Sequence, residues 1–527
     1  MQMSIAHASL VMIATLIASR VLGWLRLSVI GAQFAGDARE LDAFWAAFRI
    51  PDTIFNLLVA GALASAFIPV FSSYLAKERE SEAWHVASSV MNAMLVALVL
   101  LSGVMWLAAP FLVPLMVPEF DDRQLALTTE LTRIMLFSPI FMGLSALFTG
   151  VLNSYRQFLS GATAPLVYNA VIILFALFAA PFLGIHALAW GVVAGAAMMW
   201  LVQVPELTFR RTRYQISFDL AHAGVREIAT LAWPRTIALA AVQIVLFVDI
   251  NLASRMAPGS LTALTYAFQL MLLPLGVFSI AISAAVFPTL SRYASLGLQG
   301  RMRDALEQAM RWILFLTLPT AIVMIVLRRP IVHLLFQYGE FGDAAREATA
   351  LAFLFYAVGL AGHALVQILA RAYYATKDTT PPLAMTLVSI GTNVILAILL
   401  APSLGINGLA LANSIATLAE AALLLVVLAP RARLRLLAIG ISALRHLTAS
   451  LAMGVAMFLF IRVTNIPLDL ALEPPKPLLL LQTMIAVAFG GAVYVLASSL
   501  ARVPELDEIV TFLRARRPFR REVTAAP

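Results

Sequence analysis

Long apolar stretches, each close to the length that crosses a lipid bilayer, constrain this 527-residue chain most strongly. A transmembrane helix needs about 20 consecutive, mostly apolar residues, and in lipid each span must satisfy its own backbone hydrogen bonds. With 61% hydrophobic and only 12% charged residues, the chain is predicted to be an all-α polytopic membrane protein of about 14 spans. The predicted spans cover residues 8–35, 42–75, 87–117, 128–153, 163–183, 186–208, 227–255, 262–292, 308–336, 348–372, 382–402, 406–429, 444–464 and 478–501.

Basic residues in alternate connections predict the orientation. The connections 209–226 and 429–445 are rich in arginine, whereas 118–123 and 338–343 on the other side are acidic or neutral. The positive-inside rule therefore predicts that both termini are cytoplasmic, which requires an even number of spans. The net charge of +8 is assigned to these loops, and nucleic acid is not expected as a partner.

An internal repeat indicates a duplication. The segment Ala66–Tyr74 is echoed by Ala285–Tyr293 at a displacement of 219, which Tyr155 and Tyr374 share, and Pro181-F-L-G-Ile185 returns as Pro402-S-L-G-Ile406. A duplicated six-helix unit gives a parallel repeat, an arrangement used for alternating access. The predicted organisation is an N-lobe at 1–215, a C-lobe at 216–430, an interfacial segment with spans 13 and 14 at 431–501, and a basic cytoplasmic tail at 502–527. Residues 431–445 could form an amphipathic surface helix or a basic connector.

Missing motifs argue against an enzyme. The chain has no nucleotide-binding P-loop, no H-E-x-x-H zinc motif and no G-x-S-x-G nucleophile motif. It contains no cysteine, and its polar connections are too short for a folded catalytic domain. No catalytic residue is therefore predicted.

The first charged cluster, Ser19-R-V-L-G-W-L-Arg26, lies inside the first span. A charge at the bilayer centre costs roughly 2.5–3.5 kcal/mol on insertion scales, so such residues usually face a partner or a hydrated cavity. Arg20 and Arg26 point about 120° apart on a straight helix, and a break near Gly23 would turn both into one cavity. Alternatively, one of them extends to the membrane interface.

The second cluster, Asp42–Asp52, opens the second span. Asp42 and Arg49 are seven residues apart and share a helix face, and Pro51 frees backbone groups that need polar surroundings. Asp52 lies on one face with Asn56. Asp42 could instead cap the second span at its N-terminus.

Further polar residues interrupt later spans. Asp249 lies deep in the seventh span, where a carboxylate must be protonated, paired or bound to a cation. Asp378 lies at a cytoplasmic helix end, where a turn or cap role is the alternative. Asn393, Arg235 and Arg255 are further candidates.

These motifs, with Leu273-P-L-G-V-Phe278 and Arg371-A-Y-Y-A-T-K-D-Thr379, resemble the MurJ (MviN) family over essentially the whole chain. The resemblance implies two six-helix lobes plus two extra helices, within the multidrug/oligosaccharidyl-lipid/polysaccharide exporter group. It implies a lipid II flippase, which exports the undecaprenyl-pyrophosphate-linked peptidoglycan precursor across the bacterial inner membrane.

By the same resemblance, Arg20, Arg26 and Asp42 match functional positions, and we assign Arg49, Asp52, Arg255 and Gln269 to substrate binding beside them. Family members often have arginine where this chain has Phe55 and Gln269, so Arg49, Arg255 or Arg235 would have to compensate. Some members bind sodium, which points to Asp249, Asp378 and Asn393 as ligands. Sodium or the membrane potential is the expected energy source.

The expected partners are lipid II, membrane lipids and other cell-wall synthesis proteins, and the expected state is a monomer. Alternatives are a flippase for another polyprenyl-linked glycan or a cation-coupled multidrug exporter. From a different class, a membrane-embedded cell-wall enzyme or scaffold is a further alternative.

Overall fold

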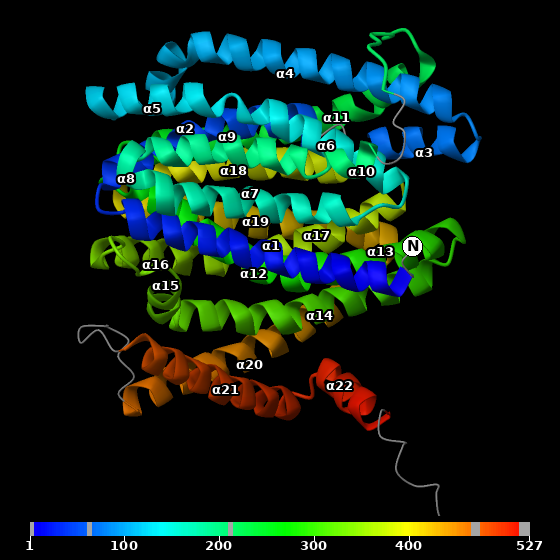
Figure 1. The fold of residues 1–527 in the computed structure, drawn as a ribbon. Coiled ribbons are helices and arrows are strands. Elements are labelled where there is room, and N and C mark those ends of the chain that lie inside the picture. Colours follow the sequence, from blue (N-terminus) through cyan, green and yellow to red (C-terminus); the bar gives the residue numbers. More distant parts are fainter. Residues whose placement is uncertain (1–4, 61–65, 209–213, 465–474, 516–527) are drawn as a thin grey trace, which may run out of the picture. The chain divides into compact units, whose positions relative to one another are not determined.

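The computed structural model describes residues 5–60, 66–208, 214–464 and 475–515, and its regular structure in these ranges is helical (Figure 1). This confirms the predicted all-α class. Parts of the second predicted span, Arg210, Arg211 and Arg213, and the end of the basic tail lie outside the described residues.

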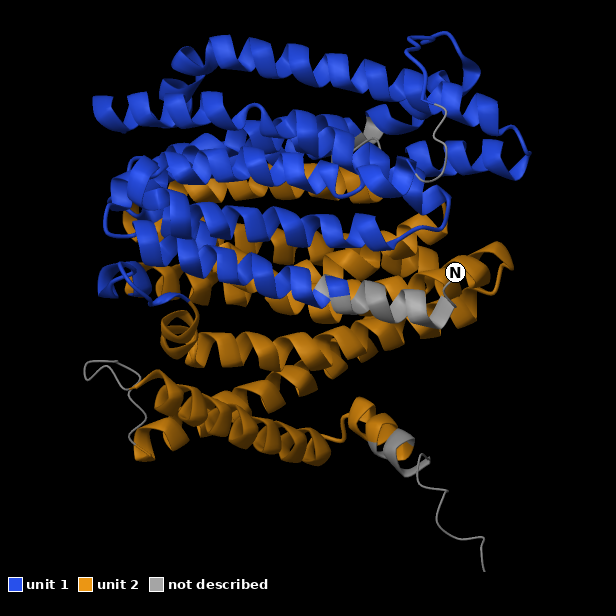
Figure 2. Ribbon diagram, viewed as in Figure 1, with its two compact units in different colours: residues 1–266, 336–346 blue, residues 267–335, 347–527 orange. Residues whose placement is uncertain are grey.

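The helices group into two compact units (Figure 2). Unit 1 comprises residues 1–266 and 336–346, and unit 2 comprises residues 267–335 and 347–527. The boundary therefore passes through helix α12, whereas the lobe boundary at 215/216 stays a prediction.

Unit 1 contains the first copy of the repeat and the start of the second. Its elements are α1 (Ile5–Phe34), α2 (Ala38–Phe55), the π-helix η1 (Asn56–Ala60), α3 (Ile68–Ala76), α4 (Glu80–Met116), α5 (Asp122–Met135), α6 (Ser138–Ser154), α7 (Leu159–Leu174), η3 (Phe175–Ala179), α8 (Ala180–Leu183), α9 (His186–Leu201), α10 (Val204–Thr208), α11 (Ala223–Ala253) and the first turns of α12 (Ser260–Pro274).

Unit 2 contains most of the second copy and the extra helices. Its elements are the rest of α12, η4 (Leu275–Ile280), α13 (Ala281–Ser295), α14 (Gln299–Val326), α15 (Arg328–Phe336), α16 (Asp343–Val358), α17 (Leu360–Ala375), α18 (Thr380–Leu404), α19 (Ile406–Ala432), α20 (Leu436–Val463), α21 (Lys476–Leu500) and α22 (Pro504–Ala515). Segments at the ends of α15 and α16 belong to unit 1.

Backbone geometry supports the duplication. The π-helices η1 and η4 begin 219 residues apart, before α3 and α13 respectively. Gly184 and Gly405, 221 apart, have nearly the same conformation, with φ of 55° and 57° and ψ of −140° and −138°. Arg156 and Lys377, also 221 apart, both have φ of 60°. At this corner Tyr155 corresponds to Thr376, so its match to Tyr374 in the sequence lies two positions away from the structural one.

Ten predicted spans coincide with helices, or helix groups, that are long and apolar enough to cross a membrane in the described chain. The bent pair α16–α17, with a bend of 43°, would make an eleventh and coincides with the predicted span 348–372. The remaining three predicted spans correspond to α1, to α2 with α3, and to α11. The total of fourteen stays a prediction.

Two predicted boundaries were wrong. The span at 308–336 ends earlier, because α14 stops at Val326 and the short helix α15 follows. Residues 431–445 form no separate surface helix: α19 ends at Ala432 and α20 begins at Leu436. The extra helices are anchored by the buried Phe315, Met453, Met457 and Tyr494 in the core that α14, α20 and α21 share.

Candidate functional site

Helix α2 carries the largest group of candidate residues. Asp37 caps its N-terminus by accepting hydrogen bonds from the amides of Arg39 (3.0 Å) and Glu40 (3.2 Å). The helix continues through Pro51 and then widens into the π-helix η1. A π-helical turn releases backbone hydrogen bonds and is frequent at functional sites.

Asp42 is buried, with 3% of its surface exposed, and binds the start of α12 within unit 1. Its carboxylate accepts hydrogen bonds from the amide of Gly259 (2.7 Å) and from the amide (2.8 Å) and hydroxyl (2.7 Å) of Thr262. An anion at a helix N-terminus satisfies free amides and the helix dipole together. The alternative that Asp42 caps its own span is wrong, because Asp37 occupies that position.

A second group joins α2 to α11. Arg49 and Asp52 form an ion pair at 3.3 Å, and Thr53 bonds to Gln243 of α11 at 3.3 Å. Asp249 of α11 lies within electrostatic reach of Arg49.

Two buried polar atoms of this group have no hydrogen-bond partner within the described residues: the Nε of Arg49 and one carboxylate oxygen of Asp249. Buried polar atoms normally have partners, so each such exception needs an explanation. A polar ligand or water in this region would supply the missing bonds.

Arg26 joins the same unit from α1. Its guanidinium carbon lies 5.8 Å from the centre of the Tyr168 ring on α7, within the range of a cation–π contact. The Nε of Arg26 is also buried and without a partner in the described chain. Arg26 can therefore still donate hydrogen bonds to an anion.

Arg20 is not turned toward Arg26. The break near Gly23 that would turn both arginines into one cavity is absent, because α1 is continuous from Ile5 to Phe34. Without that break the two arginines stay about 120° apart around the helix. Arg20 is exposed, so its part in binding stays a prediction.

Arg255 and Gln269 lie elsewhere. Arg255 is exposed just beyond α11 and bonds to Asn251 at 3.0 Å in unit 1. Gln269 is an exposed residue of α12 in unit 2. The side chain of Arg235 lies outside the described part of the structure.

The predicted sodium ligands do not fit one shared site. Asp378 is paired with Arg431 at 2.7 Å, and Asn393 lies buried on α18 with an unpartnered oxygen. Asn393 lies 13 helical steps, or about 20 Å, beyond Thr380 on α18, so one ion cannot contact both Asp378 and Asn393. Asp249 belongs to unit 1. In the described chain no three His, Cys, Asp or Glu side chains are placed to hold a metal ion.

Sequence reasoning missed a segment that closes one end of unit 1. Residues 336–346 come from the second half of the chain yet pack in this unit. The amide of Glu340 bonds to the carbonyl of Ala32 at 2.9 Å, and the Glu340 carboxylate accepts from the amide of Gly36 at 3.3 Å.

Glycine permits this contact. A Cβ on Gly36 would lie 2.7 Å from the Glu340 carboxylate, and a Cβ on Gly31 would lie 2.9 Å from Phe341. Phe341 stacks on Tyr266, whose hydroxyl bonds to the Leu27 carbonyl at 2.7 Å. No sequence motif indicated this pairing.

The arrangement in unit 1 therefore has two parts. Arginines with free donors lie among apolar helices, where they can bind a negatively charged group. Beyond them, Asp42 and the segment 336–346 tie the ends of α1 and α2 to elements of the second repeat.

Comparison with known proteins agrees with this arrangement. The family model described as "Lipid II flippase MurJ" matches residues 31–474. A probable lipid II flippase MurJ of Rhizobium meliloti is 31% identical over 422 residues, covering 77% of this chain and 77% of that protein. The lipid II flippase MurJ of Burkholderia cenocepacia is 30% identical over 393 residues, covering 73% and 76%.

Solved structures show the same fold. A lipid II flippase MurJ in an inward closed conformation superposes with a TM-score of 0.78 at 24% identity, over 93% of this chain and 98% of that one. An inward-facing multidrug transporter of the MATE family gives a TM-score of 0.65 at 16% identity, over 81% and 99%.

Proposed function

Because this chain belongs to the lipid II flippase MurJ family, we propose that it moves lipid II from the inner to the outer leaflet of the bacterial cytoplasmic membrane by alternating access. Its basic connections support cytoplasmic termini for this multi-pass protein. The protein would act as a monomeric transporter without catalytic chemistry. It would meet other cell-wall synthesis proteins through its substrate.

The observation that carries the proposal is the pair of arginines with unsatisfied donors, Arg26 and Arg49, within apolar unit 1. Guanidinium groups form forked, charge-assisted hydrogen bonds with phosphate. Arg26 and Arg49 would hold the pyrophosphate of lipid II, while Asp52 and Asp249 keep Arg49 in place. The polyprenyl tail would remain in the surrounding lipid.

Closure on the outward side is assigned to Asp42 and the segment 336–346. Both contacts join the ends of the first two helices to the second repeat, at the end that the predicted topology places outside. Release of the headgroup would require these hydrogen bonds to open and then to re-form. Asp42 is therefore a gating residue in this proposal rather than a direct ligand of the headgroup.

The membrane potential is the energy source that we propose. It supplies about 2.3 kcal/mol per charge per 100 mV, and the inside-negative sign favours outward movement of an anionic headgroup. Sodium has less support, since Asp378 is already paired with Arg431. Replacing sodium with choline should leave the rate unchanged, whereas collapsing the potential should lower it.

Complementation of a strain depleted of its lipid II flippase tests the function. The wild type should restore growth and expose lipid II headgroups on the outer face. Arg26→Ala and Arg49→Ala should fail at normal expression, while Arg123→Ala, which changes an exposed arginine of the same unit with no assigned role, should succeed. Failure of the wild type despite membrane insertion would contradict the assignment. Full activity of Arg26→Ala would contradict only the role of that arginine.

A further inference from the structure

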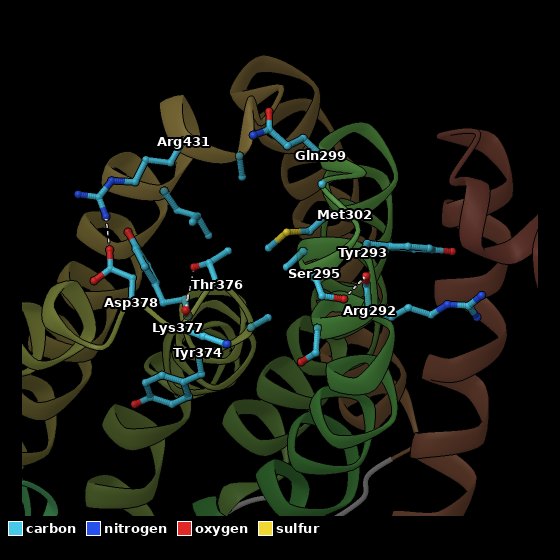
Figure 3. A pocket seen from close by; sticks show the side chains of 17 residues that line it. Arg292, Tyr293, Ser295, Gln299, Met302, Tyr374, Thr376, Lys377, Asp378 and Arg431 are labelled. Carbon is cyan, nitrogen blue, oxygen red and sulfur yellow. Dashed lines mark hydrogen bonds and ion pairs between the residues drawn. The ribbon is translucent and has the colours of Figure 1, made fainter.

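We propose that a pocket at one end of unit 2 binds the phosphate group of an anionic molecule, with Lys377 as the charge that holds it (Figure 3). The pocket has a volume of about 1050 Å³. Its walls are the C-terminal ends of α13, α17 and α19 and the start of α14. On the predicted topology this end faces the cytoplasm.

Lys377 supplies the uncompensated charge. Its side chain extends from the end of α17 into the space opposite Ser295, whereas Arg292 extends away from that space (Figure 3). On the rim, Arg431 and Asp378 neutralise each other in an ion pair at 2.7 Å. Within the described residues the Lys377 ammonium has no such partner, whereas the hydroxyls of Ser295 and Thr376 in the same pocket donate to the backbone carbonyls of Arg292 (2.9 Å) and Tyr373 (2.8 Å).

Backbone hydrogen bonds satisfy part of the carbonyl groups at the surrounding helix ends without the lysine. Three backbone hydrogen bonds close these ends: Leu298 to Tyr293 (2.9 Å), Asp378 to Tyr373 (3.1 Å) and Leu434 to Ala429 (2.9 Å). Bonds of this kind satisfy carbonyls that a helix C-terminus otherwise leaves free. The ammonium therefore remains available to a ligand.

The same corner in the first repeat is filled by aromatic side chains. Trp84 donates to the Tyr155 hydroxyl at 3.0 Å, and Phe71 packs edge-on against both rings. In the second repeat, Arg303 stands 219 positions after Trp84 and Thr376 replaces Tyr155. The pocket beside Lys377 therefore results from side chains that are specific to the second copy, and the backbone turn that both copies share does not produce it.

The shared chemistry of the ligand is a phosphate monoester or diester, held by the ammonium of Lys377. Two sources exist on the cytoplasmic side, namely the headgroup of an anionic membrane lipid and a soluble phosphate compound. The pocket belongs to unit 2 and uses none of the arginines assigned to lipid II, so it can be tested independently of flipping.

The natural absence of cysteine provides a clean probe. Ser295→Cys in the full chain is labelled with a bimane fluorophore and placed in nanodiscs of phosphatidylcholine. One arm titrates inorganic phosphate against chloride at matched ionic strength. The other arm compares these nanodiscs with ones made from equal parts of phosphatidylcholine and phosphatidylglycerol. A response only to phosphatidylglycerol identifies a lipid headgroup, and a response to inorganic phosphate identifies a soluble ligand.

Four variants decide whether Lys377 holds the anion. Lys377→Gln and Lys377→Gly should weaken the response about tenfold, since a hydrogen bond to a charged group is lost. Lys377→Arg should stay within about twofold, because the charge remains. The matched control, Arg156→Gln, removes a cation from the same backbone position beside the filled corner and should have no effect. The proposal is overturned if neither inorganic phosphate nor phosphatidylglycerol changes the fluorescence of the labelled protein that keeps Lys377. It is also overturned if the labelled Lys377→Gly variant responds as strongly as that protein.

Discussion

The two copies of the repeat share their backbone turns and differ in where they carry charge. Helix α2 of the first copy contains Arg39, Glu40, Asp42, Arg49 and Asp52, whereas α12, in the same place of the second copy, contains no charged residue. Yet a π-helix follows each of them, and equivalent turns end α6 and α17. The duplication therefore supplies a common frame, and the charged residues of these two helices all lie on the first copy.

The corners and connections of the two copies differ in the same way. The first copy fills its corner with Trp84 and Tyr155, and the second leaves a pocket beside Lys377. A bond between Asp219 and His85 holds the connection after the first copy to α4. A bond between Arg435 and Glu307 holds the connection after the second copy to α14. Each difference can be tested by a substitution in one copy and the equivalent substitution in the other.

The largest effect is expected at the filled corner. Trp84 is 4% exposed, so Trp84→Ala should lower the free energy of unfolding by about 3–5 kcal/mol through lost packing. The equivalent change, Arg303→Ala, removes a partly exposed side chain that pairs with the neighbouring Asp304 and should cost no more than about 1 kcal/mol. Thermal unfolding of the purified variants measures both. Equal losses would show that the two corners are packed alike.

The next effect concerns Asp42, for which α12 offers no charged counterpart. Asp42→Ala removes three hydrogen bonds and leaves the first turn of α12 without its anion, which should cost about 2–4 kcal/mol. Asp37→Ala, which removes only the cap of α2, should cost about 1 kcal/mol. Unfolding temperatures rank the two variants, and headgroup exposure should fall only for Asp42→Ala. If Asp37→Ala is the more damaging, Asp42 does not hold the outward end closed.

The helices could be predicted from the sequence because a long apolar stretch is a local feature of the chain. Apolar stretches depend on neighbouring residues alone, and the helices confirm most of them. The orientation that the basic connections indicate stays a prediction. Glycines 184 and 405 share one conformation because the same turn closes both copies.

The site was less predictable because its partners are distant in sequence. Asp42 binds Gly259 and Thr262, more than 200 positions away, and Glu340 reaches Gly36 across 304. Helical periodicity identifies a shared face on one helix but not the helix that packs against it. The sequence also could not decide whether the first helix breaks at Gly23, because glycine in a membrane helix permits a kink without imposing one.

A smaller, pH-dependent effect is expected where the first connection meets α4. A hydrogen bond from the His85 ring lowers the pKa of the Asp219 carboxyl below its ordinary value of 3.8. A lowered folded-state pKa stabilises the docked connection above the unfolded value, and this contribution disappears as the pH falls through the folded value. The connection should therefore loosen only in strong acid.

Hydrogen exchange of the amides in 214–222, corrected for intrinsic rates, measures this loosening between about pH 6 and pH 3. Asp219→Asn should abolish the acid step. In the second connection, Arg435 should contribute no acid step of its own. Its hydrogen bond to Glu307 raises the pKa of Arg435, so the arginine stays charged over this pH range. An equal step in the Asp219→Asn protein would assign the loosening to another group.

The smallest effect tests whether the two copies share their turns closely enough to exchange residues. Glu78 and Gly297, 219 apart, end α3 and α13 with φ of 58° and 68°. In each, the following amide bonds back five residues, from Arg79 to Tyr74 and from Leu298 to Tyr293. Glu78→Gly should raise the free energy of unfolding by about 0.5–1 kcal/mol, because glycine adopts this conformation without a steric penalty. Gly297→Glu should lower it by a similar amount, and the double exchange should leave it nearly unchanged.

Unfolding curves of the three variants show whether the two turns can exchange residues. If Gly297→Glu costs several times more than Glu78→Gly gains, the turn of the second copy depends on its neighbour, the Lys377 pocket, and the two copies differ in their frame as well as in their charges.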